Sequence, residues 1–228
     1  MSAADGGARE KKHTSTITKP ISLYEFGGTE EAVRQIQSRF VKHFTSCSPV
    51  LDIGCGRGVF LELLRKAGIQ ALGIDSSEEA IAYSREKALE VEQSDALTFL
   101  SQTQQRFGGI FCSHVIEHMD FNLAMDLLNL CHRALRSGGI LLLVTPNPED
   151  LWIISEVFWL DPTHVRPYPR LLLESMLQAN SFGVVEAKQF IGSWRIIGRR
   201  NLPAYFVRRI LLGRHFGRPN LSIVAKAN

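Results

Sequence analysis

The sequence predicts an α/β fold in which helices cover both faces of a doubly wound, mostly parallel sheet. The apolar run at residues 50–53 indicates a buried strand, and Gly54, Gly56 and Gly58 end it before apolar residues recur with helical spacing. Strand, glycine-rich turn and helix make the first unit of such a fold and leave bare backbone at a helix N-terminus, where a ligand can bind. Strand-like and helix-like runs then alternate down to residue 190.

The remaining elements follow in the order that a parallel sheet requires. Residues 1–20 are polar and unpatterned, so we expect a disordered tail before a single domain at residues 21–228. A helix capped by Thr29 comes first, with a buried face of Val33, Ile36, Phe40, Val41 and Phe44. Strands are expected at residues 50–53, 71–74, 90–93, 109–113, 140–144 and 184–190, and helices at residues 59–67, 78–87, 96–101, 123–135 and 170–180. The run Ser137-Gly138-Gly139 is expected to stop a helix, and residues 221–225 to add an antiparallel strand that completes a Rossmann-like, doubly wound, seven-stranded sheet.

Composition restricts the class of protein. With 45% hydrophobic and 21% charged residues, the chain can bury a full core. No run approaches the roughly 18 apolar residues of a membrane span, and the polar start lacks the apolar stretch of a secretory signal. The cysteines show no metal-ligand spacing, so we expect reduced thiols in a cytoplasmic protein.

Positive charge is concentrated at one end of the chain. Residues 187–228 contain nine Lys and Arg residues and no Asp or Glu, although the whole chain has a net charge of only +3. Most of these cations fall in a predicted basic insertion near residues 192–220, where residues 202–212 indicate a short amphipathic helix. This mixture of cationic and apolar residues suits an anionic membrane surface, to which the chain could bind as a peripheral protein. A solvated basic face and RNA binding are the alternatives.

The glycine loop departs from the dinucleotide-binding fingerprint. Val59 stands where the last glycine of GxGxxG would be, whereas the run Asp52-x-Gly54-x-Gly56-x-Gly58 resembles the S-adenosylmethionine (SAM) loop of class I methyltransferases. Asp75 ends the next strand, where an acid can accept hydrogen bonds from both ribose hydroxyls. The resemblance implies SAM as cofactor, in contact with Asp52, Gly54, Cys55, Gly56, Gly58, Asp75, Ser76, Asp95, Ala96 and Ser113. Two alternatives stay open: a purely structural turn for the loop, and a helix N-cap in place of an adenine contact for Asp95.

A second motif ends the fourth strand, beside the expected reacting centre. The run Ser113-His114-Val115-Ile116-Glu117-His118 resembles the x-x-V-x-E-H stretch of the ubiquinone O-methyltransferase group, where the neighbouring acid and His can hold a divalent cation. His114 takes the place of the first acid, so no metal ligand is assigned. The same residues spell H-x-x-E-H, a zinc-peptidase pattern that needs a helix and is set aside at a strand end. A structural hydrogen bond to the loop is the alternative role for His118.

The most distinctive run is Asp161-Pro162-Thr163-His164-Val165-Arg166-Pro167-Tyr168-Pro169, whose three prolines indicate a rigid loop. With the preceding motifs and the Thr145-Pro146-Asn147-Pro148 turn, it resembles a methyltransferase group of polysaccharide and glycoconjugate pathways over about residues 21–190. We expect the acceptor to contact Tyr24, His114, Asp161, Arg166 and Tyr168. His164 is our first choice for the catalytic base that takes a proton from an acceptor hydroxyl, and His118 is our second.

Together these motifs predict an enzyme that transfers a methyl group from SAM to a hydroxyl or other oxygen of a small-molecule or glycan acceptor. Transfer to nitrogen, or to the oxygen of a quinone-type or other lipid phenol, is the alternative within enzymes. A regulatory protein that binds SAM without catalysis is the alternative outside them. Nucleic acid is not expected as the acceptor, because the N/D-P-P-Y/F signature of base methyltransferases is absent.

Overall fold

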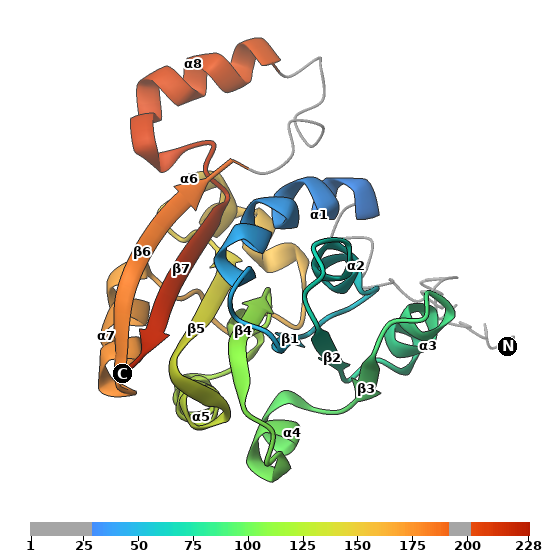
Figure 1. Ribbon diagram of the computed structural model, residues 1–228. Helices are drawn as coiled ribbons and strands as arrows, with labels where there is room; N and C mark the ends of the chain where they lie inside the picture. The colour runs from blue at the N-terminus through green and yellow to red at the C-terminus, as the bar shows by residue number, and fades with distance from the viewer. Residues whose placement is uncertain (1–28, 192–201) are drawn as a thin grey trace, which may run out of the picture.

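The computed structural model describes residues 29–191 and 202–228, with the side chains of residues 202–206 and 214 excepted. The tail predicted at residues 1–20 and the predicted acceptor contact Tyr24 lie outside the described residues. The described strands form one seven-stranded sheet in the order β3-β2-β1-β4-β5-β7-β6 (Figure 1). They are β1 (Val50–Ile53), β2 (Ala71–Asp75), β3 (Val91–Gln93), β4 (Phe107–Ser113), β5 (Leu135–Pro146), β6 (Phe182–Phe190) and β7 (Asn220–Ala227).

The strand directions fix where a ligand can bind. β1 pairs in parallel with both β2 and β4, so that Val50 lies between Ala71 and Gly109. β7 runs antiparallel to both β5 and β6, which confirms the predicted antiparallel seventh strand. The strand order turns back between β1 and β4, and the crevice beyond the carboxyl ends of these strands is where open α/β sheets bind their ligands.

Helices pack on both faces of this sheet (Figure 1). The helices of the described residues are α1 (Glu30–Gln37), α2 (Val59–Lys66), α3 (Glu78–Glu86), α4 (Ala96–Gln102), α5 (Phe121–Ala134), α6 (Leu151–Ser155), α7 (Arg170–Ala179) and α8 (Leu202–Leu212), with 3₁₀ turns at Ser38–Phe44, Ile116–His118, Val157–Leu160 and Gly213–His215. Of these, α8 does not lie on a face of the sheet but stands beyond its edge (Figure 1). Successive strand residues face opposite sides, so Leu51 packs with the core beneath α4, α5 and α7, whereas Val50 packs with Phe44 and Phe60 on the other side. No helix in the described ranges combines the length and the apolar character of a membrane span.

The first predicted helix has two parts in the structure. Thr29 caps α1 as predicted, and its Oγ1 accepts a hydrogen bond from Ala32 N at 3.3 Å. The α-helix ends at Gln37, however, and the chain continues as a 3₁₀ turn. This tighter turn carries Phe40 and Phe44 into the aromatic cluster on β4, which helical periodicity alone does not foresee.

Two further segments differ from the sequence prediction. β5 begins at Leu135, which pairs with Phe107, so the glycine turn predicted before the strand lies within it as an irregularity at Gly138 (φ +75°). Ahead of the proline-rich loop the chain forms α6 and a 3₁₀ turn, neither of which was predicted, and residues 161–169 themselves are non-helical as expected. The helix predicted in the basic insertion is present as α8.

Candidate functional site

The three glycines of the loop serve two different purposes. All have positive φ angles, +70° at Gly54, +51° at Gly56 and +72° at Gly58. A Cβ on Gly54 would lie 2.5 Å from Cγ2 of Val115, and a Cβ on Gly58 would lie 2.3 Å from Cδ1 of Leu89, so both are required by packing. A Cβ on Gly56 would meet nothing within 4 Å. Gly56 therefore borders open space, as a backbone that receives a ligand must.

Asp75 ties this loop to the end of β2. Its Oδ2 accepts a hydrogen bond from Gly56 N at 2.9 Å, and its Oδ1 accepts one from Ser77 N at 2.8 Å. A carboxylate has about four acceptor sites, so each oxygen can still accept a ligand hydroxyl. Ser76 is exposed beside it, whereas Cys55 is buried, and burial raises the pKa of its thiol. The structure thus brings Asp75, Ser76 and the loop backbone together.

Asp52 is the buried acid beneath the loop. Its side chain is only 2% exposed, and its Oδ2 has no hydrogen-bond partner among the described residues. Burial and the nearby negative charge of Asp75 raise the pKa of Asp52 well above its ordinary value. A buried carboxyl oxygen without a partner is costly, so this position favours a ligand that brings a hydrogen-bond donor or a positive charge.

Asp95 and Ala96 begin α4 on the far side of the glycine loop from β4. Asp95 caps this helix, because its Oδ1 accepts hydrogen bonds from Leu97 N and Thr98 N, both at 3.0 Å. The N-cap role left open by the sequence is therefore present. Both bonds use Oδ1, and the exposed carboxylate can still present its other oxygen to an adenine amine.

An ion pair between a buried carboxylate and a histidine whose side chain is 46% exposed lies where β4 ends. His114 follows Ser113 with a positive φ of 57°, and its Nδ1 lies 2.9 Å from Oε1 of Glu117. Thr145 Oγ1 donates to Oε2 of the same carboxylate at 3.0 Å. Burial acts to raise the pKa of Glu117, but the hydrogen bond and charge of His114 lower it below its ordinary value. Partial burial acts to lower the pKa of His114, and Glu117 overcomes this and raises it.

The proline-rich loop packs against this turn. Val165 N and Arg166 N donate to Glu117 O at 2.9 and 3.3 Å. Tyr168 is fully buried, its hydroxyl lies 2.9 Å from both Met119 O and Asp120 O, and burial raises its pKa to about 12. Tyr168 thus anchors the loop, and the structure does not present its hydroxyl to an acceptor as the sequence analysis expected. Arg166 lies over the Tyr168 ring, 5.2 Å from its centroid.

The loop brings two histidines side by side. The rings of His118 and His164 have centroids 4.8 Å apart. His164 Nδ1 lies 2.6 Å from Phe158 O, and His118 Nδ1 lies 3.2 Å from Thr163 O. A carbonyl oxygen only accepts, so each Nδ1 carries the proton and each neutral ring keeps its lone pair on Nε2. The structure therefore brings together the two candidate bases chosen from the sequence.

Asp161 orients His118 through a threonine. Its Oδ1 accepts hydrogen bonds from Thr163 N at 2.8 Å and from Thr163 Oγ1 at 2.6 Å. Since the Thr163 hydroxyl donates its proton to Asp161, it accepts from Nδ1 of His118, which lies 2.8 Å away. Burial acts to raise the pKa of Asp161, and the hydrogen bonds from Thr163 lower it below its ordinary value. Asp161 thus acts through Thr163, although its Oδ2 also lies 3.9 Å from Nε2 of His164.

One cluster in the described part of the chain has the ligand types for a divalent cation. Glu117, His118 and His164 each offer one ligand atom, and these atoms lie within 4.8 Å of one another. In metal sites the second ring nitrogen of a ligating His is held by a carbonyl, as both are here. The sequence analysis assigned no metal ligands and missed this cluster, because only the folded loop brings His164 to the turn.

A depression lies at the opposite edge of the sheet, where the strands begin. Its volume is about 630 Å³, and its lining includes Pro49, Arg65, Gln70 and Glu90. Pro49, Gln70 and Glu90 directly precede β1, β2 and β3, so this depression lies at the amino ends of the strands, whereas the glycine loop and the histidines lie at the carboxyl ends. The position of the ligand site in open α/β sheets favours the carboxyl edge.

Comparisons with known proteins identify the family of the chain. A family model described as a methyltransferase domain matches residues 27–187. The ubiquinone biosynthesis O-methyltransferase of Methylococcus capsulatus is 31% identical over 127 residues, which cover 52% of this chain and 53% of that protein. The mitochondrial ubiquinone biosynthesis O-methyltransferase of Homo sapiens is 27% identical over 157 residues, covering 59% of this chain and 41% of that protein. The chain thus spans about half the length of the curated relatives it matches.

Solved structures share the fold. A structure described as a SAM dependent methyltransferase from Archaeoglobus fulgidus superposes with a TM-score of 0.77 at 29% identity, covering 90% of this chain and all of that one. The magnesium protoporphyrin IX methyltransferase of Synechocystis with bound SAM superposes with a TM-score of 0.60 at 15% identity, covering 87% and 81%. At that identity the second likeness concerns the fold alone.

Proposed function

The chain belongs to the methyltransferase domain family, with SAM as its cofactor, and we propose that it transfers the methyl group to an oxygen of a hydroxyl-bearing small molecule. The observation that carries this proposal is the pair His118 and His164, whose Nε2 lone pairs lie at the carboxyl edge of the sheet. A hydroxyl must lose its proton as its oxygen gains a methyl group, and imidazole accepts protons near neutral pH.

The groups of SAM can be matched to the residues in and around the glycine loop, and this match supports the proposed cofactor position. SAM carries the methyl group on a cationic sulfonium, together with an ammonium group, a ribose diol and an adenine. The free acceptor sites of Asp75 suit the diol, and the other oxygen of Asp95 suits the adenine amine. The open space at Gly56 lets the cofactor lie against backbone, and the unpartnered Asp52 favours positive charge nearby.

In the proposed reaction, the side chains of this site mainly align the acceptor with the cofactor and remove one proton from the acceptor hydroxyl. Positioning of reacting groups is worth roughly 7–11 kcal/mol in favourable cases. His164 is packed against Phe158, with ring centroids 4.5 Å apart, and Phe158 O fixes its tautomer. His118 is fixed by Thr163. Nε2 of one ring takes the hydroxyl proton, and the neighbouring ring, which lies within reach of Asp161, can share it.

A divalent cation would fit the same cluster. Glu117, His118 and His164 would hold it, and it would lower the pKa of an acceptor hydroxyl that it contacted. Each oxygen of Glu117 already accepts one hydrogen bond, from His114 and from Thr145, and each has a further acceptor site for a cation. Proton removal by the histidines and ionisation beside a cation are alternatives for the same step.

Two acceptor classes fit. The resemblance of the proline-rich loop favours a sugar hydroxyl, and the relatives named for ubiquinone biosynthesis favour a phenol of the quinone type. The phenol gains support from the exposed apolar side chains Trp159, Leu160 and Val165, which are 58%, 57% and 52% exposed around the histidine cluster. An aromatic acceptor could cover these side chains on binding.

The test compares His164→Asn and His118→Asn with the unaltered chain. We expect each change to lower turnover at least tenfold, because Asn can donate as Nδ1 does but offers no base in the place of Nε2. SAM affinity, measured by calorimetry, should stay within a few-fold. If SAM affinity collapsed with turnover, the loop would belong to the cofactor site, and unchanged turnover in both variants would contradict the proposed base.

A further inference from the structure

We propose that α8 and the arginines beside it dock the chain on an anionic membrane surface. The described part of this helix presents an apolar face of Val207, Ile210 and Leu211, which are 56%, 80% and 76% exposed. Their i, i+3, i+4 spacing places them on one side of the helix. We call Val207, Ile210 and Leu211 the α8 apolar face.

The charge of the chain segment that carries this face is of one sign. From residue 187 to the end the chain has nine Lys and Arg residues and no acidic one. Arg208 is exposed directly beside the α8 apolar face. Arg209 lies on the inner side, where its guanidinium donates to Gly213 O and to Phe216 O and holds the turn after the helix. A cationic helix with an exposed apolar face is the composition of interfacial membrane helices.

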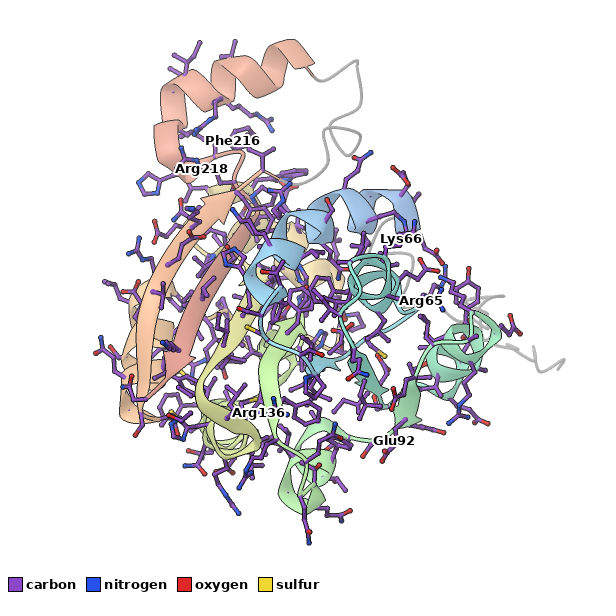
Figure 2. The ribbon with its side chains drawn as sticks, in the orientation of Figure 1. Arg65, Lys66, Glu92, Arg136, Phe216 and Arg218 are labelled. Atoms are coloured by element: carbon purple, nitrogen blue, oxygen red, sulfur yellow. The ribbon has the colours of Figure 1, made fainter. Side chains whose placement is uncertain are left out.

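The base of the helix is fixed to the edge of the crevice. His215 Nδ1 lies 3.2 Å from Glu149 O, and Arg218 N donates to Oδ2 of Asp150 at 2.7 Å. Asn147 Nδ2 donates to Arg218 O at 2.8 Å. Figure 1 shows α8 standing beyond the carboxyl edge of the sheet, and Figure 2 labels Phe216 and Arg218 where the chain returns from it. Docking through α8 would therefore turn the crevice edge, not the opposite edge, toward the membrane.

Other occupants fit less well. In a symmetric dimer the same patch meets itself, so two basic segments without acidic residues would face each other and repel. A nucleic acid would use the cations but would leave the α8 apolar face in water. An anionic lipid surface satisfies both features at once, because it attracts the cations and buries the apolar side chains. The proposal holds whatever the acceptor is.

The experiment is flotation of the full chain with vesicles of phosphatidylcholine alone or with phosphatidylglycerol added. We expect binding to the anionic vesicles only, reduced at least tenfold at high salt. Arg208→Glu should weaken it about fivefold or more, and Ile210→Glu/Leu211→Glu at least tenfold. Leu171→Glu on α7 is the matched control, because Leu171 is 76% exposed, as Leu211 is, and it should bind like the unaltered chain.

Three results would overturn the proposal. They are equal binding to both vesicle types, no binding to either, and equal loss of binding in Leu171→Glu and in the α8 variants. Light scattering on the same samples tests whether a second copy of the chain binds the α8 apolar face instead. A dimer that Ile210→Glu/Leu211→Glu dissociates, without vesicle binding, would assign the face to a second copy. Circular dichroism and SAM binding of each variant check that the fold is retained.

Discussion

A methyl group added at Gly56 should separate ligand binding from folding. Gly56→Ala places an L-residue at φ +51°, which costs about 1–2 kcal/mol of folding free energy. The new Cβ meets no protein atom within 4 Å, so no further packing cost arises in the free protein. It projects into the space that we assign to SAM, where crowding of this kind costs roughly 1–3 kcal/mol. That corresponds to about a 5- to 150-fold loss of SAM affinity.

Gly68→Ala is the matched control for this prediction. Gly68 has φ +72°, and a Cβ there also meets nothing within 4 Å, but it follows α2 at the amino edge of the sheet. Urea unfolding should show a similar loss of stability in both variants, and calorimetry should show a loss of SAM affinity in Gly56→Ala alone. Unchanged SAM affinity in a folded Gly56→Ala would refute the assignment of the loop, and an equal loss in Gly68→Ala would show that strain, not contact, is responsible.

Two further predictions concern the residues around the histidines. Thr163→Val removes the hydroxyl between Asp161 and His118, so turnover should fall about tenfold and the pH profile of turnover should shift. SAM affinity should be unchanged, and Thr163→Ser should restore activity. An unaltered pH profile in Thr163→Val would count against the orienting role. Glu117→Gln should cost about 1–3 kcal/mol of stability. The pKa of Glu117 is lowered, so this stabilisation is lost as the pH falls below the ordinary carboxyl value of 4.5. The pKa of His114 is raised, so the stabilisation is also lost as the pH rises above the ordinary imidazole value of 6.5. A loss of stability in Glu117→Gln that does not depend on pH would contradict the ion pair.

Local pattern was sufficient to predict most of the fold. The glycine loop, the acid at Asp75 and the antiparallel β7 each follow from short-range signals, namely a broken apolar run, a strand end and a final apolar stretch. The prediction was wrong where packing against distant residues decides the conformation. Phe40 and Phe44 tighten the first helix because they pack on Phe111, a partner that helical periodicity cannot reveal.

The candidate site was predicted as separate residues but not as an arrangement. His118 and His164 were both chosen, but their contact depends on backbone bonds from Val165 and Arg166 to Glu117, which no spacing rule supplies. Tyr168 was expected to face the acceptor because of its residue type, and its burial depends on the same docking. One signal was present in the sequence: an Asp two residues before a Thr in a proline-rich run favours the turn that Asp161 makes.

The central claim, methyl transfer from SAM to an acceptor oxygen, is tested most directly with SAM that carries a trideuterated methyl group. The chain would be incubated with a catechol-type quinone precursor and, separately, with a sugar-containing extract, and the products would be analysed by tandem mass spectrometry. We predict a trideuteromethyl group on a hydroxyl oxygen, formed together with S-adenosylhomocysteine and nearly absent with His164→Asn. Label on a nitrogen, or tight SAM binding with no labelled product from either source, would contradict the account.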